Sequence, residues 1–168
     1  TWREALMALN RMQIRTLAAV LGGSRFVALR AGWGSGKSYA LGAIALRRGE
    51  TSGADVMWTT DTHGRLEKVV LPVCEAMLAP AGWSYKASAN YWAKGRRRIW
   101  LSTYFRPSTR TEASNNAEGS NILTLLIDEA QAFRDDEVIR KMTGRTRVKA
   151  SEPPLRVVAG LPVYDAWW

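Results

Sequence analysis

Residues 30–38 of the chain read Arg30-Ala31-Gly32-Trp33-Gly34-Ser35-Gly36-Lys37-Ser38. A run of β-branched and aromatic residues at 25–29 precedes this glycine-rich loop, and an apolar helical pattern at 39–46 follows it. A strand, a glycine-rich turn and a helix in this order predict a phosphate-binding loop, because successive backbone N–H groups and the positive end of the helix then face a polyphosphate. The alternative is a glycine-rich turn with an incidental lysine, and the flanking strand and helix argue against it.

The residues of this loop have distinct expected roles. Lys37 would reach the β and γ phosphates of ATP and take part in catalysis, and the Ser38 hydroxyl is placed to bind Mg²⁺. The first position of the motif is Ala31, where the strict pattern has glycine. We expect the nucleotide to contact the whole loop and the residue after it: Ala31, Gly32, Trp33, Gly34, Ser35, Gly36, Lys37, Ser38 and Tyr39.

A second stretch, at 121–131, supplies the acidic residues that hydrolysis needs. It reads Asn121-Ile122-Leu123-Thr124-Leu125-Leu126-Ile127-Asp128-Glu129-Ala130-Gln131. Such an apolar run predicts a buried parallel strand that ends at the C-terminal edge of a sheet. Asp128 would hold Mg²⁺ through water or through Ser38, and Glu129 would orient and deprotonate the attacking water. The alternative is a strand that ends in a solvated acidic turn. The position of this acidic stretch after the phosphate loop favours a hydrolase.

Length and composition predict a single domain over residues 1–168. A chain of 168 residues with 46% hydrophobic content can bury one sizeable core. The sequence has no internal repeat and no apolar stretch long enough to span a bilayer. Cys74 is the single cysteine, so no intramolecular disulfide can form, and a reducing cytoplasm fits best.

The charge balance favours a polyanionic partner besides the nucleotide. Lys and Arg number 24 against 15 Asp and Glu, which gives a net charge of +9. The densest basic cluster is Lys94-Gly95-Arg96-Arg97-Arg98, between strand-like runs at 89–92 and 99–104, and this pattern predicts a β-hairpin with a basic tip. A second basic cluster lies at 140–149. Either could bind nucleic-acid phosphates, with Arg96, Arg97 and Arg98 as the first candidates; the alternative for each cluster is a solvated face.

The remaining pattern alternates helices with strands. We expect a helix at 4–20 that ends at Gly22-Gly23, a strand at 55–60, a helix at 65–78 with a kink at Pro72, an exposed loop at 105–120, a short helix at 135–142 and a strand at 155–159. Such alternation predicts an α/β fold with a parallel sheet and the nucleotide at its C-terminal edge.

Four elements together resemble the large terminase subunits of tailed bacteriophages, the motors that package viral DNA. The phosphate loop is similar to the Gly-Gly-Arg-Gly-Ser-Gly-Lys-Ser type common there, and the stretch from Glu118-Gly119 to Ala130 looks like the family's glycine, hydrophobic strand and Asp-Glu-Ala. Gln13 falls where the family has an adenine-recognising glutamine. Gly160-Leu161-Pro162, after Val158-Ala159, is similar to the motif that couples hydrolysis to movement.

The resemblance implies a P-loop NTPase of the RecA/ASCE-like type, with a mainly parallel sheet flanked by helices and a basic β-hairpin. Its cofactors would be ATP and Mg²⁺, and its partners double-stranded DNA, the portal protein of a procapsid and a small terminase subunit, in the host cytoplasm and without a membrane. The working form would be a homo-oligomeric ring, typically of five, whereas the isolated domain would be a poorly active monomer. A complete large terminase continues into an RNase H-like nuclease domain, so we expect this chain to be the packaging ATPase core.

Two departures from the family leave the arginine finger unassigned. Terminases often carry an arginine inside the phosphate loop, where this chain has Trp33, and another before the glycine ahead of the acidic strand, where it has Glu118. An arginine near the γ-phosphate stabilises charge in the transition state. The candidates for this role are Arg30, Arg106, Arg110 and Arg145.

Two other functions remain open from the sequence. Asp128-Glu129-Ala130-Gln131 also fits a DExx-box helicase, in which Gln13 would again read adenine, although a helicase needs a second RecA-like domain with arginine fingers. A non-hydrolysing, nucleotide-gated binding module is the third possibility. Glu129 argues against that module because a pure switch does not need a base, whereas the two missing arginines argue for it.

Overall fold

A computed structural model describes residues 9–103, 122–132 and 152–162 of the chain. Its elements are α2 (Arg11–Leu21), β1 (Phe26–Arg30), α3 (Lys37–Thr51), β2 (Asp55–Thr60), α4 (His63–Arg65), η1 (Leu66–Val70), α5 (Leu71–Leu78), β3 (Ser84–Lys86), η2 (Ala87–Ala89), β4 (Tyr91–Lys94), β5 (Arg97–Thr103), β6 (Ile122–Ile127), η3 (Ala130–Ala132) and β7 (Leu155–Gly160). The loop expected at 105–120 and the helix expected at 135–142 lie outside the described residues.

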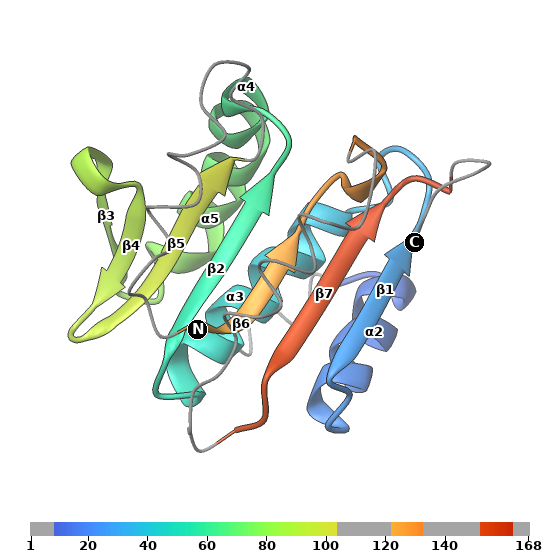
Figure 1. The fold of residues 1–168 in the computed structure, drawn as a ribbon, viewed down its shortest axis with the longest axis horizontal. Coiled ribbons are helices and arrows are strands. Elements are labelled where there is room, and N and C mark those ends of the chain that lie inside the picture. The colour runs from blue at the N-terminus through green and yellow to red at the C-terminus, as the bar shows by residue number, and fades with distance from the viewer. Residues whose placement is uncertain (1–8, 104–121, 133–151, 163–168) are drawn as a thin grey trace.

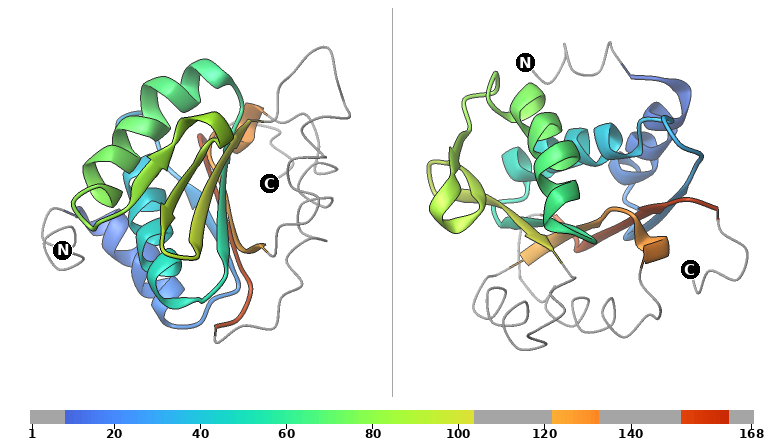
Figure 2. Two further views of the ribbon diagram at one scale, coloured as in Figure 1. Left: turned by 90° about the vertical axis from the view of Figure 1, so that its left-hand side faces the viewer. Right: turned by 90° about the horizontal axis from the view of Figure 1, so that it is seen from above.

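The described strands form one seven-stranded sheet in the order β1-β7-β6-β2-β5-β4-β3. The pairs from β1 to β5 are parallel, whereas β4 and β3 add to the sheet in antiparallel fashion. Figures 1 and 2 show α2, α3 and α5 packed together against one face of this sheet. The fold is therefore α/β with a mostly parallel sheet, as the alternation of strands and helices predicts.

The core lies between α3 and the middle strands of the sheet. All six residues of β6 are buried, which agrees with their nearly continuous apolar sequence. Leu41 and Ile44 of α3 and Trp58 of β2 are fully buried in the same cluster. This packing fixes the position of α3, whose first residue is Lys37 of the glycine-rich loop.

The first helix among the described residues begins later than the apolar stripe suggests. Instead of running from residue 4, α2 begins at Arg11, because the backbone of Asn10 is extended and its side chain accepts a hydrogen bond from the Gln13 N–H. The Gln13 side chain in turn accepts from the Asn10 N–H, and this reciprocal pair is a capping box. The prediction of one helix over 4–20 is therefore wrong at its start, whereas the end at Gly22 is confirmed.

The helix expected at 65–78 contains a π-helical turn. The segment runs through α4, η1 and α5, and the Leu71 N–H bonds to the carbonyl of Leu66 across the wider turn. Pro72 lacks an N–H and cannot donate to the carbonyl four residues before it, so an irregularity in the preceding turn is expected there. The irregularity expected at Pro72 therefore takes the form of a π turn.

The basic β-hairpin is present, with a tighter turn than the sequence suggests. Lys94 pairs with Arg97 across β4 and β5, so the turn consists of Gly95 and Arg96. Lys94 donates to Glu50 Oε1 at 2.8 Å and to the Ala81 carbonyl at 2.7 Å, which holds it against the body of the domain. The edge strand β3, which pairs with β4, was not expected.

The order of the strands brings together the segments that follow β1, β6 and β7. Because β7 lies between β1 and β6, its final residue Gly160 lies between the glycine-rich loop that follows β1 and the carboxylates that follow β6. Gly160 accepts a hydrogen bond from the Ala31 N–H at 3.2 Å. The parallel strands thus bring three segments that are distant in sequence to one edge of the sheet.

Candidate active site

The glycine-rich loop has the backbone that a phosphate cradle requires. Gly34 and Gly36 adopt left-handed conformations with φ of +68° and +82°, which a side chain would strain. Gly36 is also the N-cap of α3, and its carbonyl accepts the first helical bond from the Ala40 N–H. The loop therefore ends directly at a helix N-terminus, the position that favours an anion.

Lys37 is held inside the loop. Its side-chain amine donates to the carbonyls of Ala31 and Gly32, both at 2.8 Å, and the residue is only 7% exposed. These acceptors are neutral, so anionic phosphate oxygens can replace them with stronger charge-assisted bonds. The position fits the predicted contact of Lys37 with a polyphosphate.

Ser38 and Asp128 meet across the site. The Ser38 hydroxyl donates to Asp128 Oδ2 at 2.7 Å, although the two residues are 90 positions apart in sequence. Asp128 is 1% exposed, and burial raises the pKa of its carboxyl to about 6, with the nearby Glu129 charge adding to the effect. Two adjacent oxygen ligands, one of them a carboxylate, are the donors that Mg²⁺ prefers. The residues therefore fit a magnesium ion.

The buried Asp128 should make the stability of the nucleotide-free chain depend on pH. Its pKa lies above the usual 3.8, so ionisation costs more in the folded state than in the unfolded state. The contribution of this group to the free energy of unfolding should be largest below about pH 4, decline between about pH 4 and 6, and stay constant above. Asp128→Asn should therefore stabilise the chain at pH 7.5 by on the order of 2–3 kcal/mol.

Urea unfolding in EDTA, repeated between pH 4 and pH 8, measures this effect. The difference between Asp128→Asn and wild type should grow as the pH rises through the titration window. A variant that is less stable than wild type at pH 7.5 would contradict the expectation.

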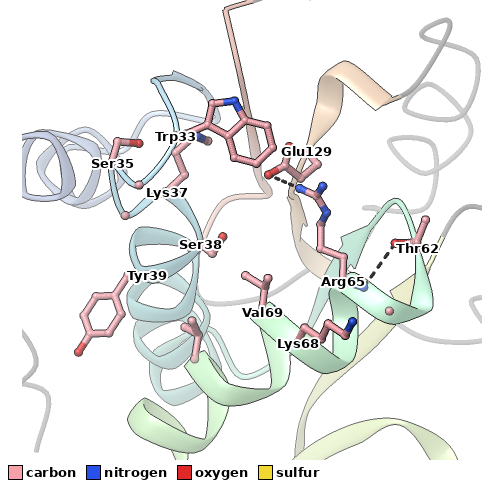
Figure 3. A pocket seen from close by; sticks show the side chains of 14 residues that line it. Trp33, Ser35, Lys37, Ser38, Tyr39, Thr62, Arg65, Lys68, Val69 and Glu129 are labelled. Atoms are coloured by element: carbon pink, nitrogen blue, oxygen red, sulfur yellow. Dashed lines mark hydrogen bonds and ion pairs between the residues drawn. The ribbon is translucent and has the colours of Figure 1, made fainter.

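Glu129 faces a cavity of about 640 Å³ that the glycine-rich loop and the helical segment after β2 line (Figure 3). Its backbone has φ of +56°, and its carboxylate contacts Arg65 at 2.5 Å between Nη1 and Oε1. The Gln131 amide donates to the other carboxylate oxygen. A carboxylate held from two sides at the wall of a cavity is suitable for orienting a water molecule.

Arg65 was missed in the sequence analysis. It lies at the end of α4, also contacts Asp61 at 3.3 Å, and lines the cavity together with Lys68. The available signal was its position just beyond β2, because the C-terminal ends of parallel strands share one edge of the sheet. Of the arginines considered earlier, Arg30 is exposed at the end of β1, whereas Arg106, Arg110 and Arg145 lie outside the described residues, as does Glu118.

The segment Gly160-Leu161-Pro162 contacts both halves of the site. Besides the Ala31 bond to Gly160, the Leu161 N–H donates to Gln131 Oε1 at 3.0 Å. The Gln131 side chain therefore joins the carboxylate of Glu129 to the backbone after β7. The predicted coupling segment is thus connected to Glu129 through Gln131.

The aromatic residues of the loop border the cavity. Trp33, at 76% exposure, and Tyr39 line it together with Ser35. Gln13 is 4% exposed and contacts the loop through its side-chain amide, which donates to the Gly36 carbonyl at 3.0 Å. Its reading of adenine stays a prediction.

The three arginines of the hairpin lie away from this cavity. Arg96 in the turn and Arg97 and Arg98 at the start of β5 are all exposed, on the side of the sheet opposite to β1 and its loop (Figure 1). The Arg98 guanidinium lies 5.6 Å from the ring centres of both Tyr91 and Trp100. The site residues and the basic cluster are therefore separate surfaces.

Solved structures share this fold over most of the chain. The large terminase of bacteriophage HK97 matches with a TM-score of 0.71 and 16% identity, over 94% of this chain and 34% of that one. The large terminase of a thermophilic bacteriophage matches with a TM-score of 0.70 and 13% identity, over 90% and 38%. The ATPase domain of the Thermus phage P74-26 large terminase matches with a TM-score of 0.60 and 14% identity, over 96% and 69%. The chain has the fold of a phage large terminase ATPase domain.

The match to the terminases is one of structure. No protein-family model matches the sequence, and no curated protein does. The chain spans just over a third of the large terminases of HK97 and of the thermophilic bacteriophage. The latter protein has also been solved in complex with ADP and with ATP-γ-S. In the part of the chain that the structure describes, no helix is both long and apolar enough to cross a membrane.

Proposed function

We propose that the chain is the ATPase domain of a phage terminase large subunit, which hydrolyses ATP to move double-stranded DNA into a procapsid. The observation that carries this proposal is the 2.7 Å contact between Ser38 of the glycine-rich loop and Asp128 at the end of β6. It joins a phosphate-binding element to a carboxylate beside Glu129, within a terminase fold.

Each residue then has a chemical task. Lys37 and the loop backbone bind the phosphates, while Ser38 and Asp128 hold Mg²⁺. Bound Mg²⁺ would neutralise charge on the phosphates. Glu129 accepts a proton from the attacking water, and Arg65 and Gln131 orient its carboxylate.

Coupling to movement would pass through the end of β7. Gly160 and Leu161 bond to Ala31 and Gln131, so a rearrangement of the loop or of Glu129 would reach this segment directly. Pro162 follows it. We assign Gly160, Leu161 and Pro162 to this role.

The proposed partners follow from the motor role. They are double-stranded DNA, the portal protein of the procapsid and a small terminase subunit, in the cytoplasm of the infected host. The working assembly would be a ring of copies, typically five. A net charge of +9 is compatible with a DNA-binding motor.

ATPase assays with different nucleic acids test the proposed function. We expect a low rate for the chain alone, and a higher rate with double-stranded DNA and procapsids. Stimulation by single-stranded DNA alone would favour a helicase instead. A chain that binds ATP under all these conditions but never hydrolyses it would favour a nucleotide-gated module.

The hairpin arginines should contribute to DNA affinity without sequence preference. Replacing Arg96, Arg97 and Arg98 with alanine should weaken binding to any duplex and lower the slope of log affinity against log salt by up to about three, because each neutralised phosphate contributes roughly 0.9. Fluorescence anisotropy over a series of salt concentrations measures the slope. If the slope is equal in wild type and variant, the cluster is a solvated face and DNA is bound elsewhere.

A further inference from the structure

We infer that Asn10 and Gln13, the capping box of α2, are positioning residues that hold the phosphate loop in its binding shape. The inference rests on the proposed nucleotide binding and concerns a role that is independent of the base. Asn10 Nδ2 donates to the Ser35 carbonyl at 3.0 Å, and Gln13 Nε2 donates to the Gly36 carbonyl at 3.0 Å. Two consecutive carbonyls of the loop are thus bound by one helix cap.

The geometry of a phosphate cradle creates a need for such donors. When backbone N–H groups of a loop turn toward a ligand, the carbonyls turn outward and must find partners of their own. Here Asn10 donates to the Ser35 carbonyl, and Gln13 gives the Gly36 carbonyl a second donor besides the Ala40 N–H. The cap therefore fixes the loop before any phosphate arrives, which lowers the ordering cost of binding.

The packing between cap and loop is close. A Cβ added to Gly36 would lie 2.3 Å from Gln13 Nε2, so the glycine is required both for its φ of +82° and for this contact. Gln13 is buried, and its Oε1 accepts from the Asn10 N–H at 2.7 Å, which fixes the orientation of the amide. The Asn10 bond is solvent-exposed, so its contribution should be the smaller of the two.

Base recognition and loop positioning predict different selectivity. An adenine reader contributes to binding of ATP and nothing to binding of GTP or of a bare phosphate chain. Residues that position the loop, here called a clamp (Asn10 and Gln13), contribute equally to the binding of all ligands that carry the phosphates. Both ends of the Gln13 amide are bonded to backbone groups, the oxygen to the Asn10 N–H and the nitrogen to the Gly36 carbonyl, which favours the clamp.

Two variants test the contacts to the loop, and the first of them leaves the helix cap in place. Asn10→Ser keeps an N-cap hydroxyl that accepts from the Gln13 N–H and loses the donor to Ser35, so the helix should be as stable as before. Gln13→Met keeps the side-chain length and loses both the donor to Gly36 and the acceptor for the Asn10 N–H, so its Tm is measured beside its affinities. Ile14→Ala, on an exposed position of the same helix, is the control.

Calorimetry of the 168-residue chain with ATP, GTP and inorganic tripolyphosphate, each with Mg²⁺, tests the inference. Gln13→Met should weaken all three ligands by one common factor of about 3 to 30, and Asn10→Ser by a common factor of about 2 to 5 with an unchanged Tm. Ile14→Ala should bind like wild type.

Three results would overturn the inference in distinguishable ways. Loss of ATP affinity alone in Gln13→Met would make Gln13 an adenine reader. Unchanged affinities in Asn10→Ser and Gln13→Met would show that the loop needs no clamp. A wild-type chain that binds neither ATP nor tripolyphosphate would remove the proposed function and this inference with it.

Discussion

Replacing Glu129 with glutamine should reduce ATP turnover at least about 100-fold and leave nucleotide binding nearly unchanged. The substitution keeps the volume of the side chain and its hydrogen bond from Gln131, but it removes the charge that accepts a proton and the ion pair with Arg65. Binding of ATP should persist because the contacts to phosphate and Mg²⁺ come from other residues. Steady-state hydrolysis and calorimetry, measured on the same preparation, separate the two effects.

A matched control is available on α5. Glu75 is exposed, so Glu75→Gln changes the net charge of the chain by the same amount without touching the site. Its turnover should equal that of wild type. An active Glu129→Gln variant would mean that another group positions the water. It would also favour the alternative function, a nucleotide-gated binding module.

Replacing Lys37 with alanine should weaken ATP binding strongly and abolish hydrolysis. The amine lies among the carbonyls of the loop, where its charge is positioned for phosphate, and charge-assisted bonds of this kind contribute more than neutral ones. The fold should survive, because the helix that follows is anchored by the buried residues of α3 rather than by this side chain. Affinity for ATP should fall at least about 100-fold.

Lys86→Ala serves as the control for this substitution, because Lys86 is an exposed residue of the edge strand β3. Calorimetry and a thermal unfolding curve should be recorded for both variants. Equal ATP affinity in Lys37→Ala and wild type would contradict the assignment of the phosphate loop.

The sequence predicts well those elements whose conformation is determined by residues within the element itself. The apolar run ending in Asp128 could only be a buried strand, and Gly34 and Gly36 supply the backbone freedom that the loop requires. The antiparallel hairpin around Gly95 also follows from local pattern. These elements can be predicted without information on the tertiary contacts around them.

The parts that the sequence did not predict depend on tertiary contacts. Nothing in the local pattern around Arg65 points to Glu129, because that contact exists only once β2 and β6 lie side by side. The link from Gln131 to Leu161 likewise requires β7 to lie next to β6. The late start of α2 at Arg11 arises from a cap, formed by Asn10 and Gln13, whose side chains also bind the loop.

The central claim is that Lys37, Ser38 and Asp128 form a magnesium-nucleotide site. Titration of the wild-type chain with ATP-γ-S in the presence of Mg²⁺ or of EDTA tests it most directly. We predict one site per chain, with affinity at least about 10-fold weaker in EDTA. Absence of binding, or equal affinity with and without Mg²⁺, would contradict the claim.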